Sequence, residues 1–172
     1  MTDPEVRLDR PGPHHALDDF ECGNTDLGTW LRRHALAAQQ MDSARTFVLV
    51  QDNRVIGYFS LTMGSVLRAE APGKLVRGLP SYPVGTVLLA RLAVHSASQG
   101  QGLGALLLAE ALRKAVTAGE AAAARLVVVD AIDEDAERFY ARHGFIAVPE
   151  HPSRLYRRMK DVRMSLEAPD GS

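Results

Sequence analysis

Hydrophobic and polar residues in the N-terminal half of the chain follow a pattern that predicts a strand, a helix and a hairpin. Val6–Leu8 is a short candidate strand, and Asn24-Thr25-Asp26 offers a helix N-cap. Behind that cap, one helical face is apolar and comprises Leu27, Trp30, Leu31, His34 and Ala38. Thr46–Val50 and Val55–Thr62 predict paired strands, because β-branched and aromatic residues fill them and Asp52-Asn53 supplies the turn.

The C-terminal half alternates apolar runs with helical patterns. Residues 68–86 form a long connection rich in proline, glycine and charge, a kind of segment that is often functional. Val87–Val94 follows as the central strand, and Arg125–Ala131 is so uniformly apolar that it predicts a parallel strand buried on both faces. The remaining predicted elements are a helix over Ala105–Ala118 that ends at Gly119, a helix from Asp133 to Gly144, and two final strands, Phe145–Val148 and Leu155–Leu166.

This order of elements predicts a single α/β domain. The chain forms a mixed sheet with a parallel pair if its elements follow the order strand, helix, hairpin, central strand, helix, strand, helix and hairpin. The chain has 172 residues, which is enough for one domain with a full core. We expect the domain to span residues 1–167 and residues 168–172 to form a disordered tail.

Composition excludes several classes of protein. The net charge of −1 gives no overall basic field, so a nucleic-acid partner must bind a local patch. The single cysteine, Cys22, allows no internal disulfide, which fits a reducing cytoplasm. The N-terminus carries no secretory signal pattern, and no apolar run approaches the roughly 18 residues of a membrane span. The histidines show no metal-ligand spacing, so no metal site is expected.

The most informative segment lies between the central strand and the helix that follows it. Gly100, Gly102 and Gly104 come directly before the predicted helix, whose first N–H groups are unpaired and whose dipole favours an anion. Their spacing does not match the dinucleotide pattern G-x-G-x-x-G, and no Lys-Ser or Lys-Thr follows as in a P-loop. The segment therefore predicts a phosphate cradle of another type. The alternative is a plain loop with a helix that starts at glycine.

Gln99-x-x-Gly102-x-Gly104 resembles the pyrophosphate-binding signature of the GNAT N-acetyltransferase superfamily, and the predicted order of elements is similar to the GNAT fold. The resemblance implies a mixed central sheet of about six to seven strands flanked by helices. It also implies that acetyl-CoA binds as co-substrate at the splayed central parallel strands, through loop N–H groups and the central strand's edge. The implied binding residues are Leu92, Ala93, Val94, Gln99, Gly100, Gln101, Gly102, Leu103 and Gly104.

Further short strings resemble the GNAT toxins of bacterial type II toxin–antitoxin systems. They are Phe20-x-Cys22-Gly23, Leu27-x-x-Trp30-Leu31, Val55–Leu61, Leu89–Val94 and Phe139-Tyr140-x-x-x-Gly144-Phe145. This resemblance implies a cytoplasmic enzyme that acetylates the α-amino group of aminoacyl-tRNA and so blocks translation. It further implies a homodimer, no membrane association, and a ribbon-helix-helix antitoxin as partner in a DNA-binding repressor complex.

Tyr140 is the candidate catalytic residue. In the GNAT toxins a tyrosine on the last helix protonates the departing thiolate, and Tyr140 matches that position. A phenol with a pKa of about 10 protonates a thiolate whose thiol has a pKa of about 8.5 only with help from its site. The alternative is a buried core aromatic, and the resemblance favours catalysis. No general base is evident, which favours an α-amine of pKa about 7.7–8.0 over a lysine near 10.4 as the acceptor.

Three cations are candidate contacts for the substrate. Lys74 and Arg77 lie on the long connection, and Arg91 interrupts an apolar strand, where a charge is expected to face a cleft or a partner. A solvated charged surface is the alternative for the first two. Two other functions stay open: acetylation of a small amine or a peptide N-terminus, and a non-catalytic CoA-binding regulatory module. The intact Gln99–Gly104 motif and Tyr140 argue against the module.

Overall fold

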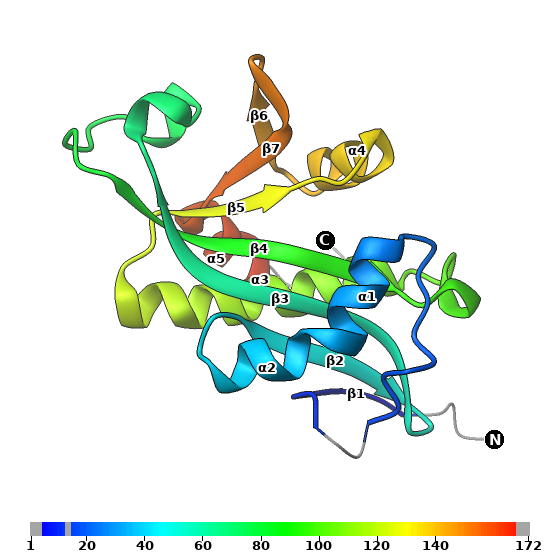
Figure 1. The fold of residues 1–172 in the computed structure, drawn as a ribbon. Coiled ribbons are helices and arrows are strands. Elements are labelled where there is room, and N and C mark those ends of the chain that lie inside the picture. Colours follow the sequence, from blue (N-terminus) through cyan, green and yellow to red (C-terminus); the bar gives the residue numbers. More distant parts are fainter. Residues whose placement is uncertain (1–4, 13–14, 168–172) are drawn as a thin grey trace. The chain divides into compact units, whose positions relative to one another are not determined.

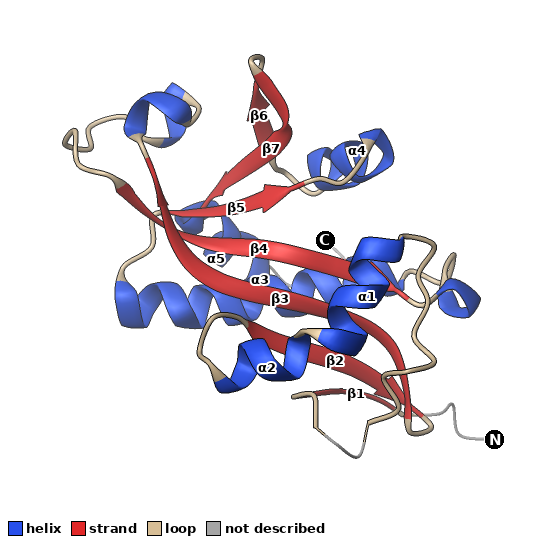
Figure 2. Cartoon of the chain, viewed as in Figure 1, coloured by secondary structure: helices blue, strands red, loops and turns tan. Residues whose placement is uncertain are grey.

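The computed structural model describes residues 5–12 and 15–167, and Figures 1 and 2 show its elements. The strands are β1 (Val6–Asp9), β2 (Arg45–Gln51), β3 (Arg54–Val66), β4 (Val84–Val94), β5 (Leu126–Asp130), β6 (Ile146–Val148) and β7 (His151–Arg158). The α-helices are α1 (Thr25–Arg33), α2 (Ala35–Gln40), α3 (Leu103–Ala122), α4 (Glu134–Arg142) and α5 (Met159–Glu167). Short 3-10 turns are η1 (Arg68–Glu70), η2 (Gly73–Leu75) and η3 (Ser96–Ser98).

Within the described residues the strands form a seven-stranded sheet in the order β1-β2-β3-β4-β5-β7-β6. β4 and β5 run parallel, with Thr86 opposite Leu126 and Leu89 opposite Val129. The pairs β1–β2, β2–β3, β5–β7 and β6–β7 are antiparallel. All four apolar residues of β5 are buried, as its sequence predicted. The predicted α/β fold with a mixed sheet and a parallel pair is therefore confirmed.

The chain folds into two compact units. The first comprises the N-terminal residues through Thr62 together with Ala90–Ala111. The second comprises Met63–Leu89 together with the residues from Leu112 onwards. The single domain over residues 1–167 stays a prediction, and the tail predicted at 168–172 lies outside the described residues. No helix in the described part of the chain is both long and apolar enough to cross a bilayer.

In the first unit, α1 and α2 pack across β2 and β3 (Figure 1). α1 begins at the predicted cap, because the Asn24 side-chain oxygen accepts a hydrogen bond of 2.9 Å from the Leu27 N–H. The β2–β3 turn uses Asp52 and Asn53 at φ 50° and 62°, a left-handed conformation that these residue types tolerate. The core beneath includes Phe20, Leu31, Ala35, Val48, Val50 and Tyr58.

The apolar face predicted for the first helical segment is wrong at His34, which is exposed. His34 occupies the C-cap position of α1 and the N-cap position of α2, and its φ is −119°. This interruption changes the phase of the helical pattern, so Ala35 is fully buried in place of His34. Leu27 and Leu31, which precede the interruption, are buried as predicted.

The connection over residues 68–86 contains more structure than its composition predicted. It includes η1 and η2 (Figure 2), and β4 starts at Val84, ahead of the predicted start at Val87. Leu75 and Val76 are buried and belong to the core of the second unit, together with Val128 and Tyr156. The connection is thus anchored by its own apolar residues.

The prediction that α3 ends at Gly119 is wrong, since the helix continues to Ala122. A Cβ at Gly119 would lie only 2.8 Å from Cε of Met159, so this glycine makes room for a neighbouring side chain. Ala123, at φ 53°, then adopts the left-handed conformation that often follows a helix.

The strand predicted over Leu155–Leu166 is wrong in its second half. β7 ends at Arg158, and Met159–Glu167 forms α5. Met159 and Val162 are buried at helical spacing, and Arg158 holds Asp161 in the first turn of α5 through bonds of 3.0 and 3.2 Å. These two local features outweigh the strand propensity of the preceding residues.

Candidate active site

The loop after β4 has the backbone geometry of an anion cradle. Gly100 and Gly102 have φ of 81° and 80°, and a Cβ at either position would meet no protein atom within 4 Å. Leu106 N–H makes the first helical bond of α3, to Gly102 O at 3.2 Å. The N–H groups of Leu103 and Gly104 therefore lie in a first turn where no helical carbonyl is available to them. A pyrophosphate fits such open, positively polarised N–H groups.

A set of hydrogen bonds fixes this loop to the segment before α1. Gln99 Nε2 donates to Cys22 O and to Val94 O, both at 2.9 Å. Ser96 N–H donates to Glu21 O at 2.7 Å, and Glu21 N–H donates to His95 Nδ1 at 3.2 Å. The Gln99 amide is thus occupied by protein carbonyls, which holds the loop in place instead of offering a free side chain. The sequence pattern gave no sign of the bonds to Cys22 and Glu21, which join residues more than seventy positions apart.

The end of β4 has an open edge beside this loop. The β4–β5 ladder ends at Leu89, so in the described chain the following residues of β4 have no β5 partner. Leu92 and Val94 are half-buried, whereas Ala93 between them packs into the core of the first unit. Unpaired backbone groups at such an edge suit an extended ligand that carries amides.

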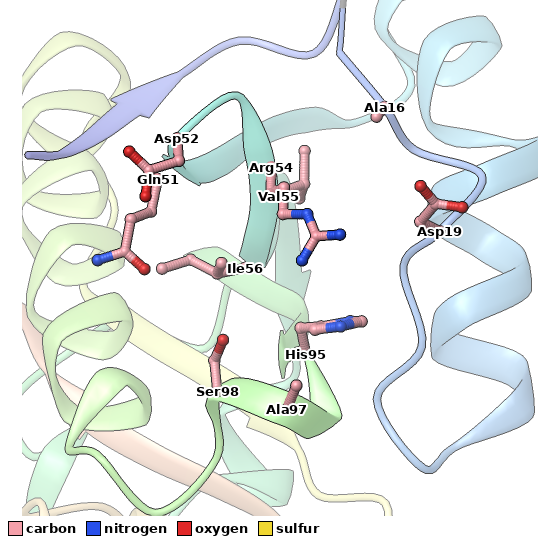
Figure 3. Close-up of a pocket in the computed structure, with 10 residues that line it drawn as sticks. All are labelled: Ala16, Asp19, Gln51, Asp52, Arg54, Val55, Ile56, His95, Ala97 and Ser98. Atoms are coloured by element: carbon pink, nitrogen blue, oxygen red, sulfur yellow. The ribbon is translucent and has the colours of Figure 1, made fainter. Parts of the chain in front are cut away.

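A cavity of about 360 Å³ lies next to the loop within the first unit (Figure 3). Its lining includes Ala97 and Ser98 of the loop but none of the residues from Gly100 to Gly104. Figure 3 shows the side chains of Asp19, Arg54 and His95 directed toward it from three separate segments. Because acidic and basic groups both line it, the cavity has no clear preference for an anion.

Arg91 has an aromatic partner. Its guanidinium carbon lies 4.0 Å from the centroid of the Trp30 ring, and Trp30 stacks on Tyr58 at 6.1 Å. The Tyr58 hydroxyl donates to Leu27 O at 2.6 Å, which fixes the stack against α1. Burial lowers the pKa of Arg91, and the nearby Tyr58 opposes this shift. The sequence indicated that this charge needs a partner but gave no sign that the partner is Trp30.

Tyr140 lies near the end of α4, in the second unit, within an aromatic cluster. The helix begins at Asp133, whose carboxylate accepts from Ala136 N–H at 2.8 Å. The Tyr140 ring is 6% exposed and contacts Phe139 and Phe145 edge-on, at 5.2 and 5.7 Å. Burial raises the pKa of Tyr140, so its hydroxyl keeps its proton. Among the described residues, no hydrogen-bond partner of this hydroxyl is found.

Lys74 and Arg77 are both exposed, Lys74 on η2 and Arg77 after it. Lys74 borders a pocket of the second unit together with Arg157. Asp130, at the end of β5, is paired with Arg154 through bonds of 2.7 and 2.9 Å, so this carboxylate orders the end of its strand. No cluster of three metal-binding side chains occurs among the described residues.

A family model described as "Acetyltransferase (GNAT) family" matches residues 14–145. The chain belongs to the GNAT acetyltransferase family. It is accordingly an acetyl-CoA-dependent acyltransferase. The loop geometry above fits that co-substrate, since the space beside Gly100 and Gly102 is free of protein atoms.

Individual relatives are similar to nearly the whole chain. A tRNA-acetylating toxin of Mycobacterium tuberculosis is 40% identical over 147 residues, which is 86% of this chain and 88% of the toxin. The structure of AtaT complexed with acetyl-methionyl-tRNAfMet is 27% identical with a TM-score of 0.85, and covers 95% of this chain and 99% of AtaT. A mutant AtaT bound to acetyl-CoA and the C-terminus of the antitoxin AtaR is 26% identical, with a TM-score of 0.82. The match covers 95% of this chain and 99% of that AtaT chain.

Proposed function

We propose that this GNAT enzyme is a toxin that transfers an acetyl group from acetyl-CoA to the α-amino group of an aminoacyl-tRNA and thereby blocks translation. The similarity to the mycobacterial tRNA-acetylating toxin carries this proposal, because it combines 40% identity with coverage of most of both chains. The AtaT complex supports it, since its RNA carries an acetylated aminoacyl group.

In this proposal the backbone binds the co-substrate. The N–H groups of Gly100, Gln101, Gly102, Leu103 and Gly104 receive the pyrophosphate oxygens. The open edge of β4 at Leu92, Ala93 and Val94 pairs with the amides of the pantetheine arm, as an added strand does. Gln99 contributes by holding the loop in shape, through its bonds to Cys22 O and Val94 O.

Tyr140 supplies the proton in the proposed reaction. Acetyl-CoA provides a thioester carbon that the amine nitrogen attacks, and its sulfur departs with the bonding electron pair. The Tyr140 hydroxyl donates its proton to that sulfur. Burial raises the pKa of Tyr140 and makes it a weaker acid, but an apolar site also destabilises a thiolate and so raises the pKa of the departing thiol. The two shifts offset each other, and the neutral hydroxyl is ready at neutral pH.

An aminoacyl ester suits a site without an evident general base. A free α-amino group has a pKa of about 7.7–8.0, and an ester lowers it, so a useful fraction is neutral at pH 7. After the C–N bond has formed, the nitrogen loses one proton to solvent, and solvent returns a proton to the Tyr140 oxygen, which restores the enzyme. The cations Lys74, Arg77 and Arg91 are the proposed contacts for the RNA and the amino acid, with Arg91 presented on the ring of Trp30.

The proposal extends to partners. AtaT is bound to the C-terminus of its antitoxin in a solved structure, and we propose a comparable antitoxin of the ribbon-helix-helix class for this chain. We further propose that the toxin acts as a homodimer, that with its antitoxin it forms a DNA-binding repressor, and that it acts in the cytoplasm, where aminoacyl-tRNA is used.

A direct assay separates this function from its rivals. The purified protein is incubated with labelled acetyl-CoA and total charged tRNA, and in parallel with deacylated tRNA and with free amino acids. We expect label in the charged RNA only, released as N-acetyl-amino acid by mild alkali, which cleaves the ester. The Tyr140→Phe variant is the matched control, and it should label the RNA only weakly.

Two results would contradict the proposal. Equal labelling of free amines, or none of RNA, would indicate an acetyltransferase for small amines or peptide N-termini. Failure of the wild-type protein to transfer acetyl groups to any amine, with acetyl-CoA binding intact, would indicate a non-catalytic CoA-binding module.

A further inference from the structure

A pocket of about 280 Å³ in the second unit contains an excess of positive charge. It lies between η2, the β6–β7 hairpin and the start of α5. Three of its lining residues are basic and one is acidic: Lys74, Arg157, Arg158 and Asp161. None of the five residues from Gly100 to Gly104 lines it, and neither does Tyr140. This pocket is therefore separate from the residues that we assign to acetyl-CoA and to catalysis.

Asp161, the only carboxylate among the described residues that line the pocket, is already neutralised. Asp161 accepts bonds from Arg158 at Oδ1 (3.0 Å) and Oδ2 (3.2 Å), a bidentate pair. Neither Arg157 nor Lys74 makes an ion pair or a side-chain hydrogen bond with any described residue. The net positive charge of the pocket is therefore carried by these two side chains.

Arg157 is held in a position where its charge is costly. It is half-buried, and burial lowers its pKa, while the charge of Asp161 opposes the shift. A Cβ at Gly144 would lie 3.1 Å from Arg157 Nε, so the guanidinium rests against the bare backbone of a residue at φ 88°. A half-buried guanidinium that makes no ion pair or hydrogen bond with a described residue favours an anion that accepts its paired N–H groups.

We propose that the Arg157–Lys74 pocket binds a backbone phosphate of the RNA substrate, an inference that rests on the proposed function. A phosphodiester oxygen pair matches the planar fork of Arg157, and Lys74 at the rim adds a second cation. Arg77 and Lys160 are exposed and lie three residues from Lys74 and Arg157 in the chain, so both segments carry a further cation. Several cations suit a polyanion better than a single carboxylate.

The test measures binding of total deacylated tRNA as a function of salt, by fluorescence anisotropy, so that it does not depend on acetyl transfer. Arg157→Gln should weaken binding about tenfold and lower the slope of log K against log salt by about one. Lys74→Gln should change both quantities in the same direction. Arg157→Lys keeps the charge but loses the fork, so its affinity should lie between wild type and Arg157→Gln while its salt slope stays that of wild type. Arg33→Gln, an exposed cation of α1, is the charge-matched control and should change neither quantity by as much.

Asp161→Asn gives a test of opposite sign. Removing this carboxylate frees Arg158 as a third cation, so tRNA binding should become about threefold tighter. A merely structural role for these residues would weaken binding in every variant. Melting temperatures identify any variant that fails to fold; if Arg157→Gln fails, Lys74→Gln and Asp161→Asn still decide the matter.

Several outcomes would overturn this assignment. They are an unchanged salt slope in Arg157→Gln, a loss no larger than that in Arg33→Gln, or weaker binding in Asp161→Asn. If Arg157→Gln loses binding to a polyglutamate peptide but still binds tRNA as wild type does, the pocket binds an acidic protein partner instead. If tRNA binding depends on Arg157 but no charged tRNA is acetylated, the pocket stands and the proposed function fails. If charged tRNA is acetylated but tRNA binding does not depend on Arg157, the proposed function stands and the pocket assignment fails.

Discussion

The loop after β4 and the aromatic cluster at the end of α4 are built in opposite ways. The loop offers backbone N–H groups, Gly100 and Gly102 are exposed, and its shape depends on the positive φ angles of these two residues. The cluster offers one side-chain oxygen on a ring that is 6% exposed between Phe139 and Phe145. An anion cradle is therefore sensitive to the addition of a side chain, whereas a buried acid is sensitive to the loss of one atom.

The largest expected effect is on the loop. Gly102→Glu should abolish measurable acetyl-CoA binding, because a carboxylate would occupy the space where a pyrophosphate has to bind. The left-handed φ of 80° adds strain of about 1 kcal/mol for any residue with a Cβ. Calorimetry on the folded variant measures this loss.

Gly102→Ala separates strain from charge in the same position. It carries the strain but no carboxylate, so it should weaken acetyl-CoA binding by about tenfold at most. Equal loss in both variants would mean that backbone shape alone matters, and unchanged affinity in Gly102→Glu would remove this loop from the site.

The next effect concerns the buried acid. Tyr140→Phe should lower kcat by about 10²–10⁴-fold, the usual scale for a lost general acid. Its affinity for acetyl-CoA should stay unchanged, since phenylalanine keeps the ring contacts with Phe139 and Phe145. Wild-type turnover in this variant would make Tyr140 a packing residue only.

The pH profile sharpens the same assignment. Burial raises the pKa of Tyr140, so the proton-bearing form is complete below the ordinary value of 10.0 and is lost only above it. Wild-type kcat/KM should therefore rise up to about pH 8 as the substrate amine deprotonates, with no decline from Tyr140 up to pH 10. A decline below pH 9 would indicate that another group is the acid.

The smallest effect tests how the loop is held. Gln99→Ala removes two exposed hydrogen bonds, which should cost about 1 kcal/mol of stability and weaken acetyl-CoA binding roughly three- to tenfold. Gln40→Ala, at the exposed end of α2, is the matched control and should change neither. Unchanged acetyl-CoA affinity in Gln99→Ala would show that the loop keeps its shape without this side chain.

Local signals predicted much of the fold. The cap at Asn24 and the turn at Asp52 and Asn53 follow from preferences of the residues themselves, and the structure confirms both. The mixed sheet follows from the order of elements and the uniformly apolar run of β5. In the candidate site, the glycine spacing indicated the loop, while the role of Tyr140 came from resemblance and stays a prediction.

Contacts between distant residues could not be predicted in this way. The sequence predicts a helix end at Gly119, but this glycine accommodates Met159, forty residues later in the chain. The sequence predicts that Arg91 faces a cleft or a partner, but it does not indicate that the partner is Trp30, on a helix far away in sequence. The difference at α5 is of another kind, because Met159 and Val162 already have helical spacing in the sequence, and this local pattern outweighs the strand propensity of the preceding residues.

The bonds that join Glu21 and Cys22 to the loop before α3 have a thermodynamic consequence. This segment leads directly into α1, so the position of that helix and the shape of the loop are not independent. A macromolecule that binds α1 only while these bonds are intact would raise the affinity for acetyl-CoA by some factor. Reciprocity then requires acetyl-CoA to raise the affinity for that macromolecule by the same factor.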